Sequence, residues 1–343
     1  MPQITPGMAV RISDLLVDWP WTRKVSPFYE ECRRESWAWF EGFKAFSPKA
    51  QKAFYEGDFS LLAAMAYPTI DKEGLRVACD LMQVFFAFDE YSDVSDEIDT
   101  RKQADALIDA LQNPVAPRPE GEWIGGEITR QFWFSARNYF TPLAQKRFLE
   151  KMRCYTDAVI EQSFDRTHHQ VRDVESYFEI RRHTIGALPS IVVCQARFNI
   201  PDHVVENPVI RRLEDYTVEL IVIANDMFSY NVEQSRGDDG HNLVTVLMTQ
   251  YRFELQQAFD WIGAMHRDLE KRFQTDLNNL PYFPEVSEEV NREVREYAWS
   301  LGAWIRANDS WSFESPRYFG TDGPRLYKER VFTVLPKREH IGL

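Results

Sequence analysis

Residues 216–233 read YTVELIVIANDMFSYNVE, an apolar run that passes into a run with oxygen-bearing side chains. The first half is mostly apolar and contains no Gly or Pro, which predicts a buried helix. On a continuous helix, Asn225, Ser229 and Glu233 lie on one face, with Cβ atoms about 5–6 Å apart. Amide, hydroxyl and carboxylate oxygens suit Mg²⁺, which keeps waters that substrate phosphates can replace. The pattern therefore predicts a metal site that binds a phosphate ester through the metal. The alternative is an ordinary polar helix face exposed to solvent.

A second candidate metal cluster lies upstream, where residues 84–93 read VFFAFDEYSD. An apolar helix is expected to end here, with Asp89 and Asp93 at positions i and i+4. Two carboxylates at this spacing repel each other unless a cation lies between them, and acids at a helix C-terminus oppose the macrodipole. The alternative is a helix that runs into an acidic loop. Together with the first motif, the cluster indicates a metal site at Asp89, with Asp93 as its partner at i+4.

Bulk composition limits the class of protein. The chain has 343 residues, 44% hydrophobic and 14% aromatic, enough for one large core. A net charge of −13 argues against nucleic acid or an anionic membrane as a partner. No CxxC pair, leader-like N-terminus or apolar run of about 20 residues is present. We expect a cytoplasmic protein with reduced cysteines and no stable membrane association.

Helical periodicity runs along the whole chain, and its breaks coincide with Pro or Gly. No strand-like alternation is clear, although residues 330–335 could be extended. We expect one all-α domain, a helical bundle with a central cavity, over residues 1–343, with an N-terminal segment (1–25) and a C-terminal tail (320–343). The expected helices are 28–43, 59–66, 73–88, 100–111, 122–140, 142–168, 174–184, 188–198, 208–232, 242–250, 253–280 and 285–310.

Both motifs occur in a known family. DEYSD (residues 89–93) and NDMFSYNVE (residues 225–233), in this order, resemble the two metal-binding motifs of class I terpene cyclases. The RRHTIG run (residues 181–186) and the late Arg317-Tyr318 pair resemble the family's diphosphate-binding elements. The likeness extends over residues 10–336.

Two further segments narrow the resemblance. LLVDWPWTRKVSPFYEE (residues 15–31) and the His241-Asn242 pair resemble fungal sesquiterpene cyclases. GDDGHNLVTVLM (residues 237–248) is most similar to basidiomycete enzymes that make protoilludene. This likeness implies 1,11-closure of farnesyl diphosphate to a humulyl-like cation.

The resemblance implies residue roles. Asp89, with Asp93 and Glu90, would hold metal on one wall, and the Asn225 motif would hold metal on the other, with three Mg²⁺ ions in all. Arg182, Arg317 and Tyr318 would donate hydrogen bonds to the diphosphate. The roles of Arg181 and Arg182 are exchangeable from sequence alone, and the four-residue spacing to Gly186 favours Arg182.

One position departs from the family pattern. Many relatives carry Lys or Arg directly before the last acidic ligand, whereas this chain has Val232. The diphosphate contact that this basic residue makes must therefore be missing or come from elsewhere.

Apolar side chains near the motifs are expected to line the cavity. Phe85 and Phe86 precede Asp89 by one turn, and an aromatic face can stabilise a cation by about 0.5–2 kcal/mol. Trp311, Ile221 and the effector-region Gly186 are the other candidates. We also expect the loops at 93–100 and 235–240 to become ordered when metal and diphosphate bind.

Three alternatives remain open at this stage. The cyclase could form another product through 1,10-closure, of the germacrene or cadinane type. A chain-elongating prenyltransferase would share the helical fold but carry two aspartate-rich motifs. A non-catalytic helical binding protein would need no hard-cation ligands on apolar walls. The chain is expected to be a monomer or a homodimer.

Overall fold

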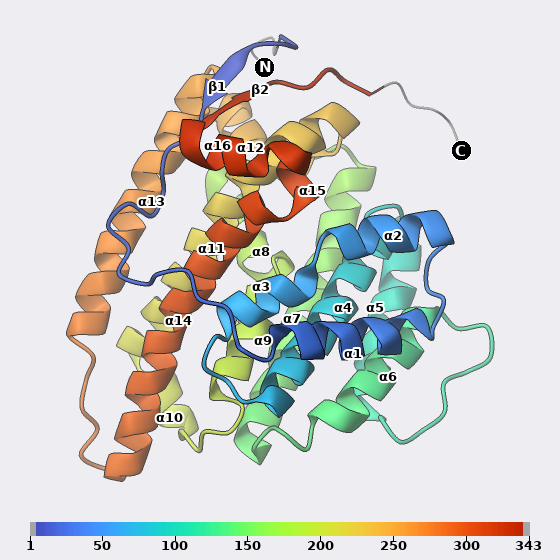
Figure 1. Cartoon of the computed structure of the whole chain (residues 1–343), viewed down its shortest axis with the longest axis vertical. Coiled ribbons are helices and arrows are strands. Elements are labelled where there is room, and N and C mark those ends of the chain that lie inside the picture. Colours follow the sequence, from blue (N-terminus) through green and yellow to red (C-terminus); the bar gives the residue numbers. More distant parts are fainter. Residues whose placement is uncertain (1–4, 339–343) are drawn as a thin grey trace.

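Two long helices carry the two motifs and belong to different halves of the bundle (Figure 1). The computed structural model describes residues 5–338. Helix α4 (Lys72–Ser92) packs against α1, α3, α5 and α6, whereas α11 (Pro208–Arg236) packs against α13 and α14. Helices α7, α8 and α9 connect the two halves.

The remaining helices surround these two and range from four residues in α10 and α15 to 27 residues in α14. The bounds are α1 Tyr29–Glu41, α2 Pro48–Glu56, α3 Phe59–Ala66, α5 Glu97–Gln112, α6 Ile124–Ala136, α7 Pro142–Thr167, α8 Val174–Thr184, α9 Ala187–Val192, α10 Asp202–Val205, α12 Leu243–Gln250, α13 Leu255–Asn278, α14 Glu288–Glu314, α15 Pro316–Phe319 and α16 Gly323–Glu329. Short 3₁₀ turns are η1 Val193–Gln195, η2 Asp239–His241 and η3 Gly320–Asp322.

Local signals explain where the motif helices begin and end. The Asp71 side chain accepts a hydrogen bond from the backbone N–H of Gly74 and so caps the start of α4. Helix α11 starts with Pro208 in its first turn, after Asn207, and ends at Gly237, whose φ is 86°. Between these ends α11 runs without a break for about 40 Å, at roughly 1.5 Å per residue.

A small antiparallel sheet closes the bundle at one end. Strand β1 (Ala9–Arg11) pairs with β2 (Val331–Thr333), and buried Val10 lies opposite buried Phe332. The segment that follows β1 inserts Trp19 and Trp21 next to α14. The Cβ of an alanine at Gly302 would lie 2.3 Å from the Trp21 ring, so only glycine lets the segment approach this closely.

The predicted all-α class is confirmed, and so are most of the long helices. The expected helix at 28–43 ends earlier, at Glu41. Helix α2, which Ser47 caps and Pro48 begins, was not predicted. The helix expected at 188–198 is α9 followed by the turn η1. The extended tail is correct, but its partner β1 was not foreseen, because a three-residue strand has no recognisable period.

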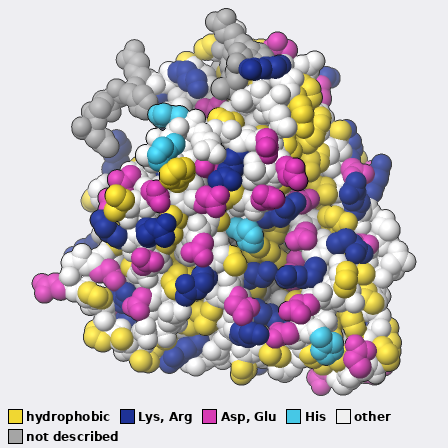
Figure 2. Space-filling view, turned by 180° about the vertical axis from the view of Figure 1, so that it is seen from behind, with side chains coloured by type: hydrophobic (Ala, Val, Ile, Leu, Met, Phe, Trp, Pro, Cys, Tyr) yellow, Lys and Arg dark blue, Asp and Glu magenta, His cyan; other side chains and the backbone are white. Residues whose placement is uncertain are grey.

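Charges of both signs are interspersed on the face shown in Figure 2, where Asp and Glu side chains alternate with Lys and Arg. No extended basic area is visible on this face of the described chain, in keeping with the net charge of −13. Within residues 5–338, no helix combines the length and the apolar character that a bilayer crossing requires.

Candidate active site

A cavity of about 730 Å³ lies between α4 and α11 and contains both motifs. Its volume falls within the roughly 300–1,000 Å³ that is typical of small-molecule sites. Asp89 and Glu233, on opposite walls, both line this one chamber. The predicted site residues that line it are Phe85, Phe86, Asp89, Glu90, Asp93, Gly186, Ile221, Asn225, Ser229, Glu233, Trp311, Arg317 and Tyr318.

The α4 wall carries carboxylates that two arginines partly neutralise. Arg317 donates hydrogen bonds to Asp89 (3.2 Å) and Glu90 (3.3 Å), and Arg166 lies 3.7 Å from Asp93. Burial raises the pKa of Asp89. The positive charge of Arg317 opposes this rise, and the negative charge of Glu90 adds to it. Burial and the neighbouring Asp89 raise the pKa of Asp93 well above its usual value. These groups would be stabilised as anions by a further cation.

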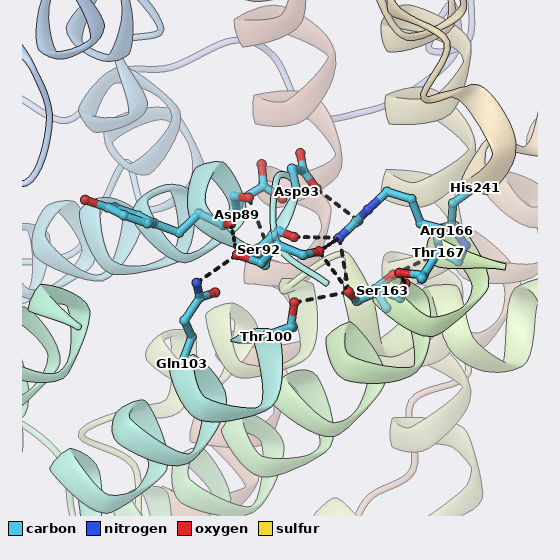
Figure 3. A network of polar contacts seen from close by, with 12 residues as sticks. Asp89, Ser92, Asp93, Thr100, Gln103, Ser163, Arg166, Thr167 and His241 are labelled. Atoms are coloured by element: carbon cyan, nitrogen blue, oxygen red, sulfur yellow. Dashed lines mark hydrogen bonds and ion pairs between the residues drawn. The ribbon is translucent and has the colours of Figure 1, made fainter. Parts of the chain in front are cut away.

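Arg166 also forms hydrogen bonds with the backbone at the C-terminal end of α4 (Figure 3). Its guanidinium donates hydrogen bonds to the carbonyl oxygens of Ser92 (2.6 Å) and Ser95 (2.9 Å), and to the Ser163 hydroxyl (3.2 Å). The last carbonyls of a helix have no partner within it, so a cation at this point is favourable. Arg166 therefore holds the turn that presents Asp93.

The α11 wall presents the second motif as its helical spacing predicts. Asn242 Nδ2 donates hydrogen bonds to Glu233 Oε2 (2.9 Å), to Ser229 Oγ (3.4 Å) and to the Asp226 carbonyl oxygen (2.9 Å). Asn242 is fully buried and also caps α12. Burial, reinforced by Asp226, raises the pKa of Glu233 to about 7.

Arg181 is locked beside the Asn225 motif by a buried carboxylate. Its guanidinium donates to Asn225 Oδ1 (2.8 Å) and to Asp226 Oδ1 (3.0 and 3.3 Å). Asp226 also accepts hydrogen bonds from the Tyr177 hydroxyl and the backbone N–H of Leu243. Burial opposes the charge on Arg181, but Asp226 and Tyr177 outweigh it, and the pKa of Arg181 rises.

Arg182 was preferred over Arg181 as the arginine that binds diphosphate, but the positions of the two side chains do not support this choice. Arg181 lines the cavity, whereas Arg182 is absent from its lining and forms an ion pair with Glu219 at 2.5 Å. Consecutive residues of a helix point about 100° apart, and on α8 it is Arg181 that points into the chamber. The spacing to Gly186 could not distinguish them.

The adjacent residues Arg317 and Tyr318 connect the two walls. Arg317 contacts the carboxylates of α4, whereas the Tyr318 hydroxyl accepts a hydrogen bond from Asn225 Nδ2 at 2.8 Å. The short helix α15 begins at Pro316, directly after the β-region residue Ser315 that ends α14, and this corner turns both side chains inward.

Below the charged mouth, the cavity is lined by aromatic and aliphatic groups. The Phe86 ring lies 6.0 Å from the Trp311 ring, and the Arg317 guanidinium lies 5.0 Å above Phe86. Phe85 meets Tyr155 edge-on at 5.1 Å. A side chain at Gly186, whose φ is 70°, would project towards both of these rings. Predicted lining residue Ile221 is also buried here.

The oxygen donors fit a hard divalent cation better than a soft one. Carboxylate, amide and hydroxyl oxygens face the chamber. Two of these groups already accept hydrogen bonds from guanidinium groups: Asp89 from Arg317, and Asn225 Oδ1 from Arg181. Among residues 5–338, no three His, Cys, Asp or Glu side chains converge into a closed metal cluster. A cation here would therefore need additional ligands, which diphosphate oxygens and waters can provide.

Sequence reasoning missed several residues that shape the site. Arg166, Asp226 and Tyr155 were not singled out, and Asn242 was noted only as part of a resembling pair. Asp226 lies inside the quoted motif, where its position next to Asn225 was the available signal. Arg166 and Tyr155 come from α7, and no local pattern links them to either motif.

Solved structures share this architecture. Hedycaryol synthase in complex with nerolidol superimposes with a TM-score of 0.74 at 16% identity, covering 88% of this chain and 99% of that one. A variant of cucumene synthase gives the same TM-score at 22% identity, covering 86% and 99% of the two chains. The fold is that of the class I terpene synthases.

Sequence comparison identifies the family. Residues 80–272 match the model described as terpene synthase family 2, C-terminal metal binding. A delta(6)-protoilludene synthase of Stereum hirsutum is 47% identical over 95% of this chain and 92% of its own. The delta(6)-protoilludene synthase of Armillaria gallica is 45% identical over 95% and 94%. The chain belongs to the terpene synthase family, in which the motif resemblance had placed it.

Proposed function

We propose that this chain is a Mg²⁺-dependent sesquiterpene synthase that ionises farnesyl diphosphate and cyclises it to delta(6)-protoilludene. The observation that supports this most strongly is one chamber with oxygen donors and arginines at its mouth and aromatic rings below. The identity of 43–47% to several protoilludene synthases supports the product.

The charged mouth would bind the metal–diphosphate group. Asp89, with Asp93 and Glu90, would provide oxygens from α4, and Asn225, Ser229 and Glu233 would provide them from α11. Divalent ions bound here would stabilise the negative charge that develops on the departing diphosphate. We propose three Mg²⁺ ions, as the family resemblance implies.

Three side chains would donate hydrogen bonds to the diphosphate. Arg181 and Arg317 present planar guanidinium groups, which match phosphate oxygens in pairs and stay charged. In this structure Arg181 contacts Asn225 and Arg317 contacts Asp89, so binding would move each guanidinium from a metal-binding oxygen to the diphosphate. Tyr318 would add a hydroxyl donor. Arg236 lines the cavity one turn after Val232 and could supply the missing positive charge.

The lower chamber would fold the isoprenoid chain and exclude water. Phe85, Phe86 and Trp311 present ring faces or edges to a chain whose positive charge migrates after ionisation, and Ile221 adds an apolar surface. Gly186 leaves room beside Phe85 and Tyr155, where a larger residue would narrow the chamber. The contour of the chamber would decide which ring closure takes place, and the identity to protoilludene synthases supports 1,11-closure.

The test is incubation with farnesyl diphosphate and Mg²⁺, with and without isopentenyl diphosphate, followed by mass spectrometry of the volatiles. We expect protoilludene and released diphosphate in both mixtures. A germacrene- or cadinane-type product would contradict the proposed ring closure. A longer prenyl diphosphate would contradict cyclase activity, and no turnover would favour a binding protein.

Two substitutions test the proposed metal ligands. Asp89→Ala and Asn225→Ala should each lower turnover at least about a hundredfold at saturating Mg²⁺, because each removes an oxygen that holds the leaving group's counter-charge. Circular dichroism should show unchanged helix content. Wild-type rates in either variant would refute the assignment.

A further inference from the structure

One amide side chain lies in the apolar lower part of the active-site chamber. Asn308 of α14 is only 5% exposed and lines this chamber. Its Nδ2 donates a long hydrogen bond of 3.5 Å to the carbonyl oxygen of Ile221 on α11. Ile221 precedes the proposed metal ligand Asn225 by one turn, about 6 Å along the helix axis. Asn308 therefore lies about one turn below the metal-binding oxygens of α11.

The amide oxygen of Asn308 is left without a partner. Because a carbonyl oxygen can only accept hydrogen bonds, the Asn308 nitrogen must face Ile221, and this orientation turns Oδ1 the other way. Within residues 5–338, no donor forms a hydrogen bond with this oxygen. Buried polar atoms are normally paired, so an acceptor that is free inside a cavity is available to a molecule bound there.

Two other polar groups of the chamber wall are turned towards the protein instead. The Ser190 hydroxyl donates a hydrogen bond to the carbonyl oxygen of Gly186 at 2.8 Å. The indole N–H of Trp311 donates to the carbonyl oxygen of Gly57, also at 2.8 Å. Trp311 therefore presents only its ring to the chamber, whereas Asn308 presents a carbonyl dipole.

Two indole rings flank Asn308 on the same face of α14. Trp304 lies four residues before it and Trp311 three residues after it, and both line the chamber. Ring faces carry negative electrostatic potential, and the amide oxygen adds the negative end of a fixed dipole. Fixed dipoles act more strongly on a charge in a dry cavity than in water. This face of α14 therefore suits a carbocation, which has no polar hydrogen of its own.

We propose that Asn308 is a specificity-determining residue, whose Oδ1 stabilises the carbocation formed by the first ring closure. This inference rests on the proposed function. When a distant double bond attacks the carbon that carried diphosphate, its electron pair forms the new C–C bond, and the positive charge moves to the other carbon of that double bond. The lower chamber would hold this part of the isoprenoid.

Stabilising this cation favours further ring closure over early loss of a proton. In early loss, the electron pair of a C–H bond becomes a new double bond, and the proton passes to diphosphate or to water. The sequence of closures then ends with fewer rings. The oxygen of Asn308 would thus influence which hydrocarbon leaves the enzyme.

Product profiles of two variants test the role of the oxygen. Asn308→Leu removes it at nearly constant volume, whereas Asn308→Asp keeps an oxygen at the same place, and both variants lose the amide N–H. With farnesyl diphosphate and Mg²⁺, Asn308→Leu should lower the share of the main wild-type product at least about threefold, in favour of hydrocarbons with fewer rings. Asn308→Asp should keep the main product. A wild-type profile in Asn308→Leu, or an equal change in both variants, would overturn the proposal.

Ser312→Ala is the matched control for a disturbance of α14. The Ser312 hydroxyl, one turn further along the helix, donates to the backbone carbonyl oxygen of Asn308 at 2.7 Å, and Ser312 does not line the chamber. This variant should keep the wild-type profile. A change as large as that in Asn308→Leu would assign the effect to helix packing and overturn the proposal. If circular dichroism shows that Asn308→Leu is unfolded, Asn308→Ala removes the same oxygen and replaces it.

Binding of a stable cation tests the same contact without turnover. N,N-dimethylazacycloundecanium is a ring with a permanent positive charge and no N–H, and cycloundecanone is a neutral ring of the same size. In calorimetry with Mg²⁺ and inorganic diphosphate present, Asn308→Leu should weaken binding of the cation at least about fivefold and that of the ketone less than about twofold. Equal weakening of both, or unchanged binding of the cation, would overturn the proposal. A wild-type enzyme without turnover would contradict the proposed function instead, and the cation would still decide the role of Asn308.

Discussion

At the scale of single residues, Arg181 and Arg182 provide the sharpest test of the site. Arg181→Lys should lower turnover of farnesyl diphosphate about a hundredfold, because lysine cannot make the paired hydrogen bonds of a planar guanidinium. Arg182→Lys keeps the charge beside Glu219 and should stay within about threefold of the wild type. Steady-state kinetics of both variants, with circular dichroism as a check on folding, gives the comparison. A greater loss of turnover in Arg182→Lys would assign diphosphate binding to Arg182 instead.

At the scale of helices, the end of α4 depends on a side chain from α7. Arg166→Ala should raise the Mg²⁺ concentration for half-maximal activity about tenfold, because the carbonyls of Ser92 and Ser95 lose their donor and Asp93 is no longer held. Amide exchange at residues 92–96 should be faster in this variant even without metal.

The matched control for this helix end is Arg153→Ala, an exposed arginine on the same helix. It should leave both the Mg²⁺ dependence and the amide exchange unchanged. If Arg166→Ala behaves like this control, α4 does not need the contact.

At the scale of the whole molecule, one buried carboxyl makes stability depend on pH. Burial, opposed by Arg330 and Arg306, raises the pKa of Asp309 to about 6. The unfolded chain, with a pKa near 3.8, loses this proton first as pH rises, so the free energy of unfolding falls between about pH 4 and 6. Asp309→Asn should therefore be more stable than the wild type at pH 7, by up to about 3 kcal/mol.

Urea unfolding at pH 4 and pH 7 measures this difference. The two proteins should be similar in stability at pH 4, where Asp309 in the folded chain is protonated. Asp105→Asn, at an exposed position of α5, serves as the control and should show no such gain. A constant difference between Asp309→Asn and the wild type at both pH values would contradict the shift.

Closure of the mouth is also a property of the whole molecule. Asp93 and residues 238–240 line the cavity from loops that follow α4 and α11. We expect amide exchange at 93–100 and 235–240 to slow when Mg²⁺ and inorganic diphosphate are added together. The reason is that the metal–diphosphate group would contact both loops and so order them. The loop at 279–287, between α13 and α14, should not respond. Unchanged exchange at the two mouth loops would contradict closure.

The helical class and the grouping of the motif residues on their helices followed from the sequence alone, because both are local. Helical periodicity is carried by neighbouring residues, and spacings of four along one helix determine which side chains share a face. The placing of Asn225, Ser229 and Glu233 on one face of α11, and of Asp89 and Asp93 near the end of α4, needed no tertiary information.

Tertiary packing decided what the spacing left open. Whether Arg181 or Arg182 faces the chamber depends on how α8 is rotated against α11, where Asp226 and Glu219 each select one guanidinium. Arg166 and Asn242 reach the motifs from α7 and from the start of α12. Contacts between segments distant in the chain arise from packing, which no local pattern encodes.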